Sequence, residues 1–159
     1  MPSRVEIHQN FVTRFHSGKR PKRASAKQLD AVEKALKTKL PNAFREFMLR
    51  HGAVYTPDIL DEIVDNDLDH PDLQNVFDPK EAIAGTKGCW SAGMPEDVIG
   101  IASDCMGNTI GFRRQAKTSD DAPVVLFDHD MVDVSAIARS FDKFLAWYLK
   151  HLKGKQANA

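Results

Sequence analysis

Three apolar runs in the second half of the chain constrain the fold more than any other feature of the sequence. They read DVIGIAS at 97–103, NTIGFRR at 108–114 and PVVLFDHD at 123–130, and short polar stretches separate them. Short runs rich in Val, Ile and Phe and bounded by Gly, Asn and Asp are typical of β-strands. Because short connections join strands antiparallel, we expect a meander. The third run is apolar on both faces, which indicates a covered strand.

Helical patterns precede and follow these strands. Ser25 and Gln28 form a capping box, which starts one helix. A second helix begins at Pro41 and stops at Gly52, since proline suits a first helical turn and glycine a helix end. After the strands, apolar residues recur at the spacing of one helix face: Phe141, Phe144, Leu145, Tyr148, Leu149 and Leu152.

Two more helix starts lie in the middle of the chain. Residues 56–64 predict a short helix with one acidic side. Asp78, with Pro79 after it and Glu81 three residues on, is typical of another capped start. We expect this helix to be short because Gly85 and Gly88 follow quickly.

These elements together predict an α+β fold, with N-terminal helices, an antiparallel β-sheet meander and a C-terminal helix packed on the sheet. We assign residues 25–153 to a single domain of this kind, residues 1–24 to an N-terminal arm with a helix and a basic linker, and residues 154–159 to a frayed tail. The helix of the arm covers residues 4–16, and four residues form one side of it: Val5, His8, Val12 and Phe15.

Five residues, 104–108, lie between the first two strands and could form either a functional site or a turn. Gly107 supplies the positive φ of a tight reversal, and Asp104 and Asn108 can bond nearby backbone groups. A calcium loop needs acids at alternate positions and a distant bidentate Glu, and here Met106 occupies an alternate position. We therefore interpret the segment as a hairpin turn.

Asp128, His129 and Asp130 form the most enzyme-like group, since carboxylate and imidazole bind metals and transfer protons. On a strand, however, the two carboxylates face one way and the imidazole the other. We favour a solvated strand end, and a metal-dependent hydrolase that uses these three residues is an alternative. The prediction is no catalytic residue, no metal site and no cofactor.

The two cysteines, Cys89 and Cys105, do not show the paired spacing of zinc ligands. A nucleophilic thiol needs a neighbouring base, which sequence alone does not place. No run approaches the ~20 apolar residues of a membrane span, and the first residues lack a signal-peptide core. We expect a cytoplasmic protein with reduced thiols and no membrane partner.

Charge is distributed unevenly along a chain whose formal net charge is zero. Residues 1–50 hold 12 Lys and Arg against 4 Asp and Glu, whereas residues 51–79 hold 8 acids and no Lys or Arg. A solvated face explains such a segment, and a docking surface for a basic partner is the alternative. Six of these acids are candidate partner-binding residues: Asp58, Asp61, Glu62, Asp65, Asp67 and Asp69.

Residues 19–23, with the sequence KRPKR, are typical of a phosphate-contacting segment. No aromatic residue lies among them to stack on bases, so we interpret them as a flexible linker and expect no nucleic-acid partner. Trp147 lies outside the apolar stripe of its helix, and Trp90 lies between glycine-rich turns. Large amphipathic aromatics favour protein contacts, and we include Trp90 among the partner-binding candidates, with core packing as the alternative for both.

Four motifs in their order along the chain resemble the SUKH superfamily. The first is LDAVEKALKTKLPNAFREFMLRHGA at 29–53, and the second is the hairpin DVIGIASDCMGNTIGF at 97–112. PVVLFDHD and the closing IARSFDKFLAWYL, at 137–149, are similar to the next strand and the final helix of that pattern. The resemblance extends from about Ser25 to Leu149. The arm before Ser25 and the long acidic segment depart from it.

This superfamily contains proteins resembling a yeast cell-wall synthesis regulator of the Smi/Knr type, and bacterial immunity proteins that bind polymorphic toxins, often nucleases or deaminases. The resemblance implies a non-enzymatic immunity protein whose partner is a cognate toxin, as a monomer or weak homodimer. A regulatory scaffold that binds a host protein is the alternative. The pattern has no catalytic residues and marks scaffold positions: Pro41, Gly52, Asp104, Gly107, Asn108, Ser140, Phe141 and Phe144.

Overall fold

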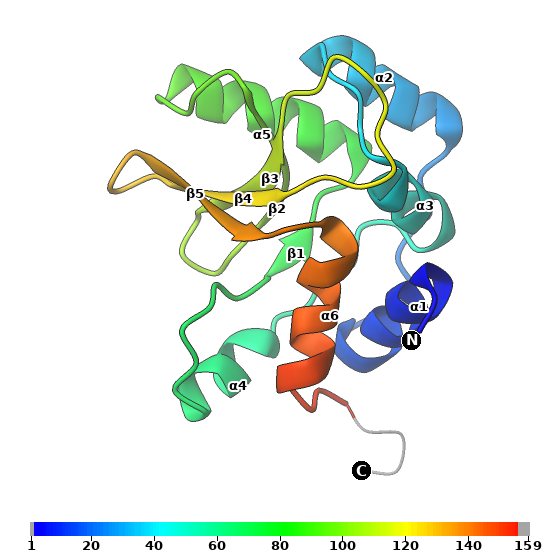
Figure 1. Ribbon diagram of the computed structural model, residues 1–159, viewed down its shortest axis with the longest axis vertical. Helices are drawn as coiled ribbons and strands as arrows, with labels where there is room; N and C mark the ends of the chain where they lie inside the picture. The colour runs from blue at the N-terminus through cyan, green and yellow to red at the C-terminus, as the bar shows by residue number, and fades with distance from the viewer. Residues whose placement is uncertain (1, 156–159) are drawn as a thin grey trace.

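The computed structural model describes residues 2–155 of the 159-residue chain and confirms the α+β class (Figure 1). The helices are α1 (Arg4–Phe15), α2 (Ala26–Leu36), α3 (Asn42–Arg50), α4 (Ile59–Asp65), α5 (Pro79–Ser91) and α6 (Phe141–His151). The strands are β1 (Asn75–Val76), β2 (Val98–Ser103), β3 (Thr109–Arg113), β4 (Val124–Asp128) and β5 (Asp133–Ala138). All neighbouring strands pair antiparallel, in the order β1-β2-β3-β4-β5.

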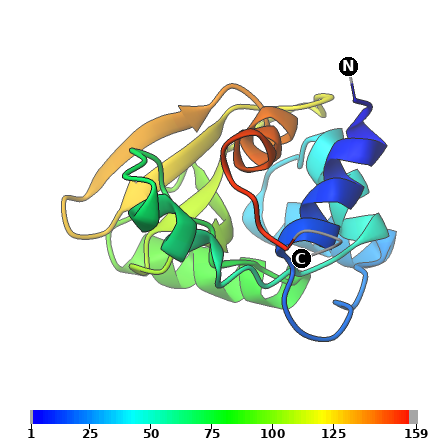
Figure 2. The same ribbon diagram turned by 90° about the horizontal axis from the view of Figure 1, so that it is seen from below.

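Helices cover both faces of this sheet (Figures 1 and 2). α5 packs on β2 and on α2 at one face, and α6 packs on β5 and α1 at the other. The main core joins the aromatic residues of α1, α3 and α6 to the sheet, and a smaller core lies around Val98 and Phe127. The meander predicted from the three apolar runs is therefore the central layer of the domain.

Two glycines face each other in the β2–β3 hairpin. Gly100 pairs with Gly111, and a Cβ at Gly111 would lie 1.9 Å from the carbonyl oxygen of Ile99. A side chain there would force the two strands apart, so glycine is required by the close approach of the backbones.

The prediction of a short helix after Asp78 was wrong. α5 has 13 residues and runs through both Gly85 and Gly88. Thr86 explains the difference: its hydroxyl accepts a hydrogen bond from the backbone N–H of Gly100 at 2.9 Å and donates one to the carbonyl of the same residue at 3.3 Å. This docking on β2 outweighs the cost of two helical glycines, about 1 kcal/mol each.

The N-terminal helix shares the main core of the domain. Phe11 and His8 are fully buried, whereas Val5, predicted to lie on the inner side, is 45% exposed. At the start of α1, the Arg4 guanidinium forms ion pairs of 2.6–2.7 Å with three carboxylates, on α3, on the loop before β4 and on α6: Glu46, Asp120 and Asp142. This arrangement ties residues 4–15 to the rest of the fold.

Strands β1 and β5 were not predicted. β1 has two residues, and β5 has the sequence DVSAIA, in which Asp, Ser and Ala weaken the strand signal. β5 is one of the two edge strands of the sheet, and its pairing with β4 shifts register between Val124 and Val125. Such bulges protect exposed edges from pairing with other chains.

Candidate protein-binding surface

α4 presents most of the acidic segment to solvent. Ile59 and Ile63 are buried and anchor the short helix, so its other side faces outward. Five of the six predicted partner-binding acids are exposed, and no residue of the described range 2–155 forms a hydrogen bond or ion pair with their carboxylates: Asp58, Asp61, Asp65, Asp67 and Asp69.

Glu62, the sixth predicted acid, holds the end of the chain. Its carboxylate accepts hydrogen bonds of 2.8 Å from the backbone N–H groups of Lys153 and Gly154. Lys155 then donates its backbone N–H to the carbonyl of Arg14 at 2.8 Å. Gly154 and Lys155 were expected to belong to a frayed tail, and these bonds instead fix them against α4 and α1. Residues 156–159 of that tail lie outside the described residues.

The last two acids of the segment have structural roles. Asp72 is buried and accepts a hydrogen bond from the backbone N–H of Cys105 at 3.0 Å, and burial raises the pKa of its carboxyl above the usual value. Asp78 caps α5 in a reciprocal capping box with Glu81, as predicted. The sequence segment thus separates into exposed carboxylates around α4 and structural carboxylates near the sheet.

The segment between β2 and β3, residues 104–108, is confirmed as a hairpin turn. The Asp104 carboxylate accepts hydrogen bonds of 2.8–2.9 Å from the backbone N–H groups of Met106 and Asn108 and from the Asn108 side chain. Gly107 has a φ of +82°, the conformation that the turn required of a glycine.

Asn108 also connects this turn to the next one. Its side-chain oxygen accepts from the backbone N–H of His129 at 3.2 Å and lies 2.8 Å from the Nδ1 atom of the same residue. The connection places two hairpin turns side by side, and three apolar side chains on them are 62–76% exposed: Met106, Met131 and Val132. Sequence reasoning missed this apolar group because only the strand register brings the two turns together.

We call the combined surface the acidic end: residues 56–78, 104–108 and 128–135. None of the three segments contains a Lys or Arg. The bond between Asp72 and Cys105 joins the first to the second, and Asn108 joins the second to the third. In Figure 1, α4, the loop after it and the two hairpin turns all lie on the left of the molecule.

Asp128, His129 and Asp130 do not converge on a common centre. The Asp128 carboxylate accepts hydrogen bonds from the backbone N–H groups of Asp130 and Met131, at 2.9 and 3.1 Å, which shapes the β4–β5 turn. His129 lies 3.4 Å from the Asp130 carboxylate, so the two are not on opposite sides as strand geometry suggested. Within residues 2–155, no three His, Cys, Asp or Glu side chains are grouped so as to hold a metal ion.

The two cysteines are separate from each other and from these groups. Burial, together with Asp72, raises the pKa of the Cys105 thiol to about 11, so the thiol is protonated at neutral pH and is a poor nucleophile. The Cys89 sulfur lies 3.5 Å from the hydroxyl of Thr109.

Both tryptophans are half-buried and engaged. The Trp90 indole donates its N–H to the carbonyl of Val98 at 2.9 Å, and the Arg114 guanidinium lies 5.3 Å from its ring centre. Trp147 stacks on His70 at a centroid distance of 3.7 Å and so covers the loop after α4. Trp90 lies on α5 and packs, like Val134 of the acidic end, against the smaller core around Val98 and Phe127.

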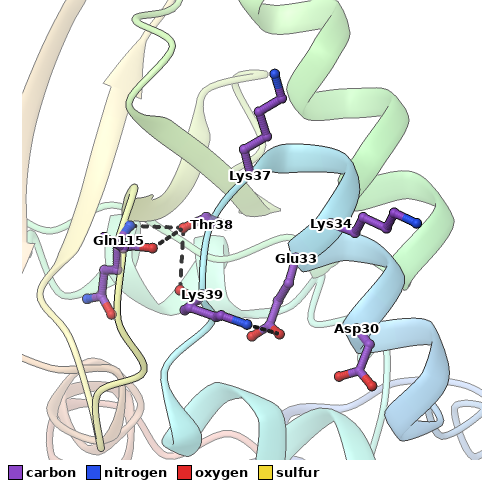
Figure 3. A pocket seen from close by; sticks show the side chains of 8 residues that line it. Asp30, Glu33, Lys34, Lys37, Thr38, Lys39 and Gln115 are labelled. Atoms are coloured by element: carbon purple, nitrogen blue, oxygen red, sulfur yellow. Dashed lines mark hydrogen bonds and ion pairs between the residues drawn. The ribbon is translucent and has the colours of Figure 1, made fainter.

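A hollow beside α2 has a volume of about 590 Å³ (Figure 3). Lys34, Lys37 and Lys39 line it together with Glu33, whose carboxylate lies 4.0 Å from the Lys39 ammonium. Thr38 bonds to the backbone of the β3–β4 loop at its floor. Acids and bases are mixed here, so this hollow has no strong preference for either charge.

The predicted scaffold positions lie at turns, caps and the core. Gly52 has a φ of +93°, and a Cβ there would lie 2.1 Å from the carbonyl oxygen of Lys22. Pro41 is the N-cap of α3, and Ser140 caps α6 by accepting the backbone N–H of Lys143 at 3.1 Å. The first buried aromatics of α6 complete the set: Phe141 and Phe144.

Comparisons with known proteins agree with this architecture. A family model described as the SMI1 / KNR4 family (SUKH-1) matches residues 23–147. A crystal structure of a protein from Pseudomonas syringae pv. tomato is similar, with a TM-score of 0.53 and 17% sequence identity over 91% of this chain and 95% of that one. No curated protein matches the sequence.

No helix in residues 2–155 has the length and apolar character needed to cross a bilayer.

The family match covers most of the chain, including the capped α2–α3 pair, the β2–β3 hairpin and the start of α6. The chain belongs to the SMI1/KNR4 (SUKH-1) family.

Proposed function

We propose that the protein neutralises a polymorphic toxin of the nuclease or deaminase type by binding it directly, without catalysing a reaction. Family membership supports a protein-binding role. The observation that carries the proposal is the acidic end: exposed carboxylates in three segments that contain no Lys or Arg, with Arg14 and Lys155 lining a hollow only beside Asp58, Asp61 and Glu62. Enzymes that act on nucleic acid need basic surfaces, and an acidic surface complements them.

Electrostatic attraction of this kind acts mainly on the association rate. Complementary charge raises the encounter rate of two proteins by roughly tenfold to a thousandfold at low salt. The acids expected to contribute are the exposed ones on and around α4: Asp58, Asp61, Asp65, Asp67 and Asp69. Glu62 contributes less, because its carboxylate is occupied by backbone donors.

Apolar contacts must accompany the charges, because binding energy concentrates in a few well-packed residues. Met106, Met131 and Val132 supply such contacts on the adjoining turns. Val132 has a φ of +50°, which is strained for a β-branched residue and holds its side chain on the exposed turn. Methionine adapts its shape to a partner surface.

Co-expression tests the proposal. The protein encoded beside this chain's gene is expressed in a heterologous bacterium with and without the chain, and the two are purified through a tag on one of them. We expect the neighbour to arrest growth alone, and the chain to restore growth and co-purify at low salt. Restored growth without a complex, or several neighbours that neither arrest growth nor bind, would refute direct neutralisation.

A further inference from the structure

The basic segment before α2 is held firmly against the domain. Ser17 donates its backbone N–H to the carbonyl of Tyr55 at 2.8 Å, and Tyr55 donates its own to Nδ1 of His16 at 3.0 Å. At the other end, the backbone N–H of Ala24 bonds to Met48 at 3.0 Å. Residues 19–23 were interpreted as a flexible linker, and these contacts instead give them a defined place, at the lower right of Figure 2.

A cleft of about 260 Å³ lies between this loop and the end of α1. Gln9 and His16 line it from the side of α1, Arg20 and Pro21 line it from the loop, and His51 lines it from the end of α3. Both nitrogens of His16 are engaged, since Nδ1 accepts from Tyr55 and Nε2 therefore donates to the Lys19 carbonyl at 2.7 Å.

Positive charge around this cleft is uncompensated. Three arginines lie close enough to His51 for their positive charge to disfavour its protonated form: Arg20, Arg23 and Arg50. Within residues 2–155, no carboxylate forms an ion pair with any of them. His51 is only 8% exposed, and its Nε2 atom has no hydrogen-bond partner. Burial first, and then His8 and the three guanidinium groups, lower the pKa of His51 to about 4. The imidazole is therefore neutral at pH 7.

The hollow of Figure 3 is a natural comparison, because it also contains three basic side chains. There, however, Glu33 lies close to Lys39, and Asp30 also lines the wall and pairs with Arg45 at 2.9 Å. A small anion meets acids in that hollow, whereas no acid lines the cleft at His51.

We propose that the cleft binds a phosphate monoester group through the Arg20 guanidinium and the His51 imidazole, with Arg23 and Arg50 supplying further positive charge. A phosphate monoester carries about −1.5 to −2 charges at neutral pH and three acceptor oxygens, which suits several guanidinium donors. A carboxylate carries only one negative charge, so its electrostatic attraction to the three arginines is weaker. The small volume of about 260 Å³ suits a single terminal group better than the continuous backbone of a nucleic acid.

Titration with inorganic phosphate and, separately, with phosphoserine tests this site. Two-dimensional NMR of the labelled protein follows the backbone signals of Gly18 and Arg20 and the imidazole of His51. We expect saturable shifts confined to the cleft, a rise in the pKa of His51 on binding, and much weaker effects of acetate. Binding of phosphoserine but not of inorganic phosphate would indicate that the bound phosphate group belongs to a phosphorylated protein.

Matched variants decide whether the cleft itself is responsible. Arg20→Gln removes a charge-assisted donor and is expected to weaken phosphate binding by about tenfold or more. Lys37→Gln, which removes one charge from the mixed hollow, is expected to leave it unchanged. Equal losses in both variants, or shifts spread over every basic residue, would overturn the proposal. So would a single-stranded oligonucleotide that binds with the same Arg20 dependence while phosphate does not.

Discussion

Individual polar side chains hold the turns of this protein in place, and Asp104 is the clearest case. Its carboxylate is almost fully buried and satisfies three N–H donors of the β2–β3 turn. A buried donor left without a partner costs about 1–3 kcal/mol. The same residue was recognisable in the sequence because it lies between two apolar runs, three residues before Gly107.

Replacement of Asp104 by alanine should therefore lower the free energy of unfolding by about 1–3 kcal/mol. Urea unfolding followed by circular dichroism measures this change. Asp130→Ala is the control, because its side chain is 79% exposed, and its effect should stay within about 0.5 kcal/mol. Equal effects of the two substitutions would show that the buried carboxylate has no special role.

His51 links stability to pH. Its folded pKa of about 4 lies below the 6.5 of an unperturbed histidine, so the unfolded chain takes up the proton first as pH falls. The contribution of a neutral His51 is fully present above pH 6.5 and is lost as the pH approaches 4. His70, whose pKa burial also lowers, acts in the same direction.

We expect the urea midpoint to decrease between pH 7 and pH 4, and the decrease to be smaller in a His51→Gln variant, which takes up no proton there. Phosphate-free buffers keep this measurement independent of ligand binding at the cleft. Identical pH profiles for the wild type and the variant would contradict the assignment of this titration to His51.

At the scale of elements, α5 shows how packing overrides local preference. Gly88 lies in the helix interior, and nothing is within 4 Å of the position that a Cβ would occupy. Gly88→Ala should therefore stabilise the protein by about 0.5–1 kcal/mol. Gly107→Ala should destabilise it, because a φ of +82° is unfavourable for alanine. Thermal unfolding compares the two, and destabilisation by Gly88→Ala would mean that the helix needs a glycine there.

Elements with strong local signals were predictable from the sequence. The capping boxes at Ser25 and Asp78, the turn at Gly107 and the stripe of α6 all arise from neighbouring residues and appear as expected. β5 could not be predicted, because its residues are strand-like only in the presence of β4. The inner face of α1 was misjudged at Val5 because ion pairs with Arg4 and packing against α6 determine its orientation.

The candidate surface was predictable only in part. A lack of basic residues in 51–79 was visible in the sequence, and it indicated where charge accumulates. The apolar group at Met106 and Met131 was not, because the two residues are joined only through strand register and the bond between Asn108 and His129. Likewise, the sequence did not show that Glu62 and Asp72 are occupied by backbone donors.

At the scale of the whole molecule, acidic and basic residues are concentrated on opposite sides although the formal net charge is zero. The acidic end lies on the left of Figure 1, and the loop between α1 and α2, with its basic residues, lies on the right. Such a dipolar distribution orients an approaching charged partner before contact, and salt weakens the effect because the Debye length is about 8 Å at 0.15 M. A basic toxin would be directed to the acidic end and away from the α1–α2 loop.

The rate of complex formation with the neighbouring gene's product tests the central claim most directly. Stopped-flow measurements at 20 and 300 mM salt compare the wild type with two variants that each remove two negative charges. Asp61→Asn/Asp65→Asn alters the acidic end, and Glu6→Gln/Glu96→Gln alters exposed acids elsewhere. We predict that the first variant associates several-fold more slowly at low salt, with a shallower salt dependence, and that the second behaves as the wild type. Equal rates for all three proteins, or no association at low salt, would contradict the account.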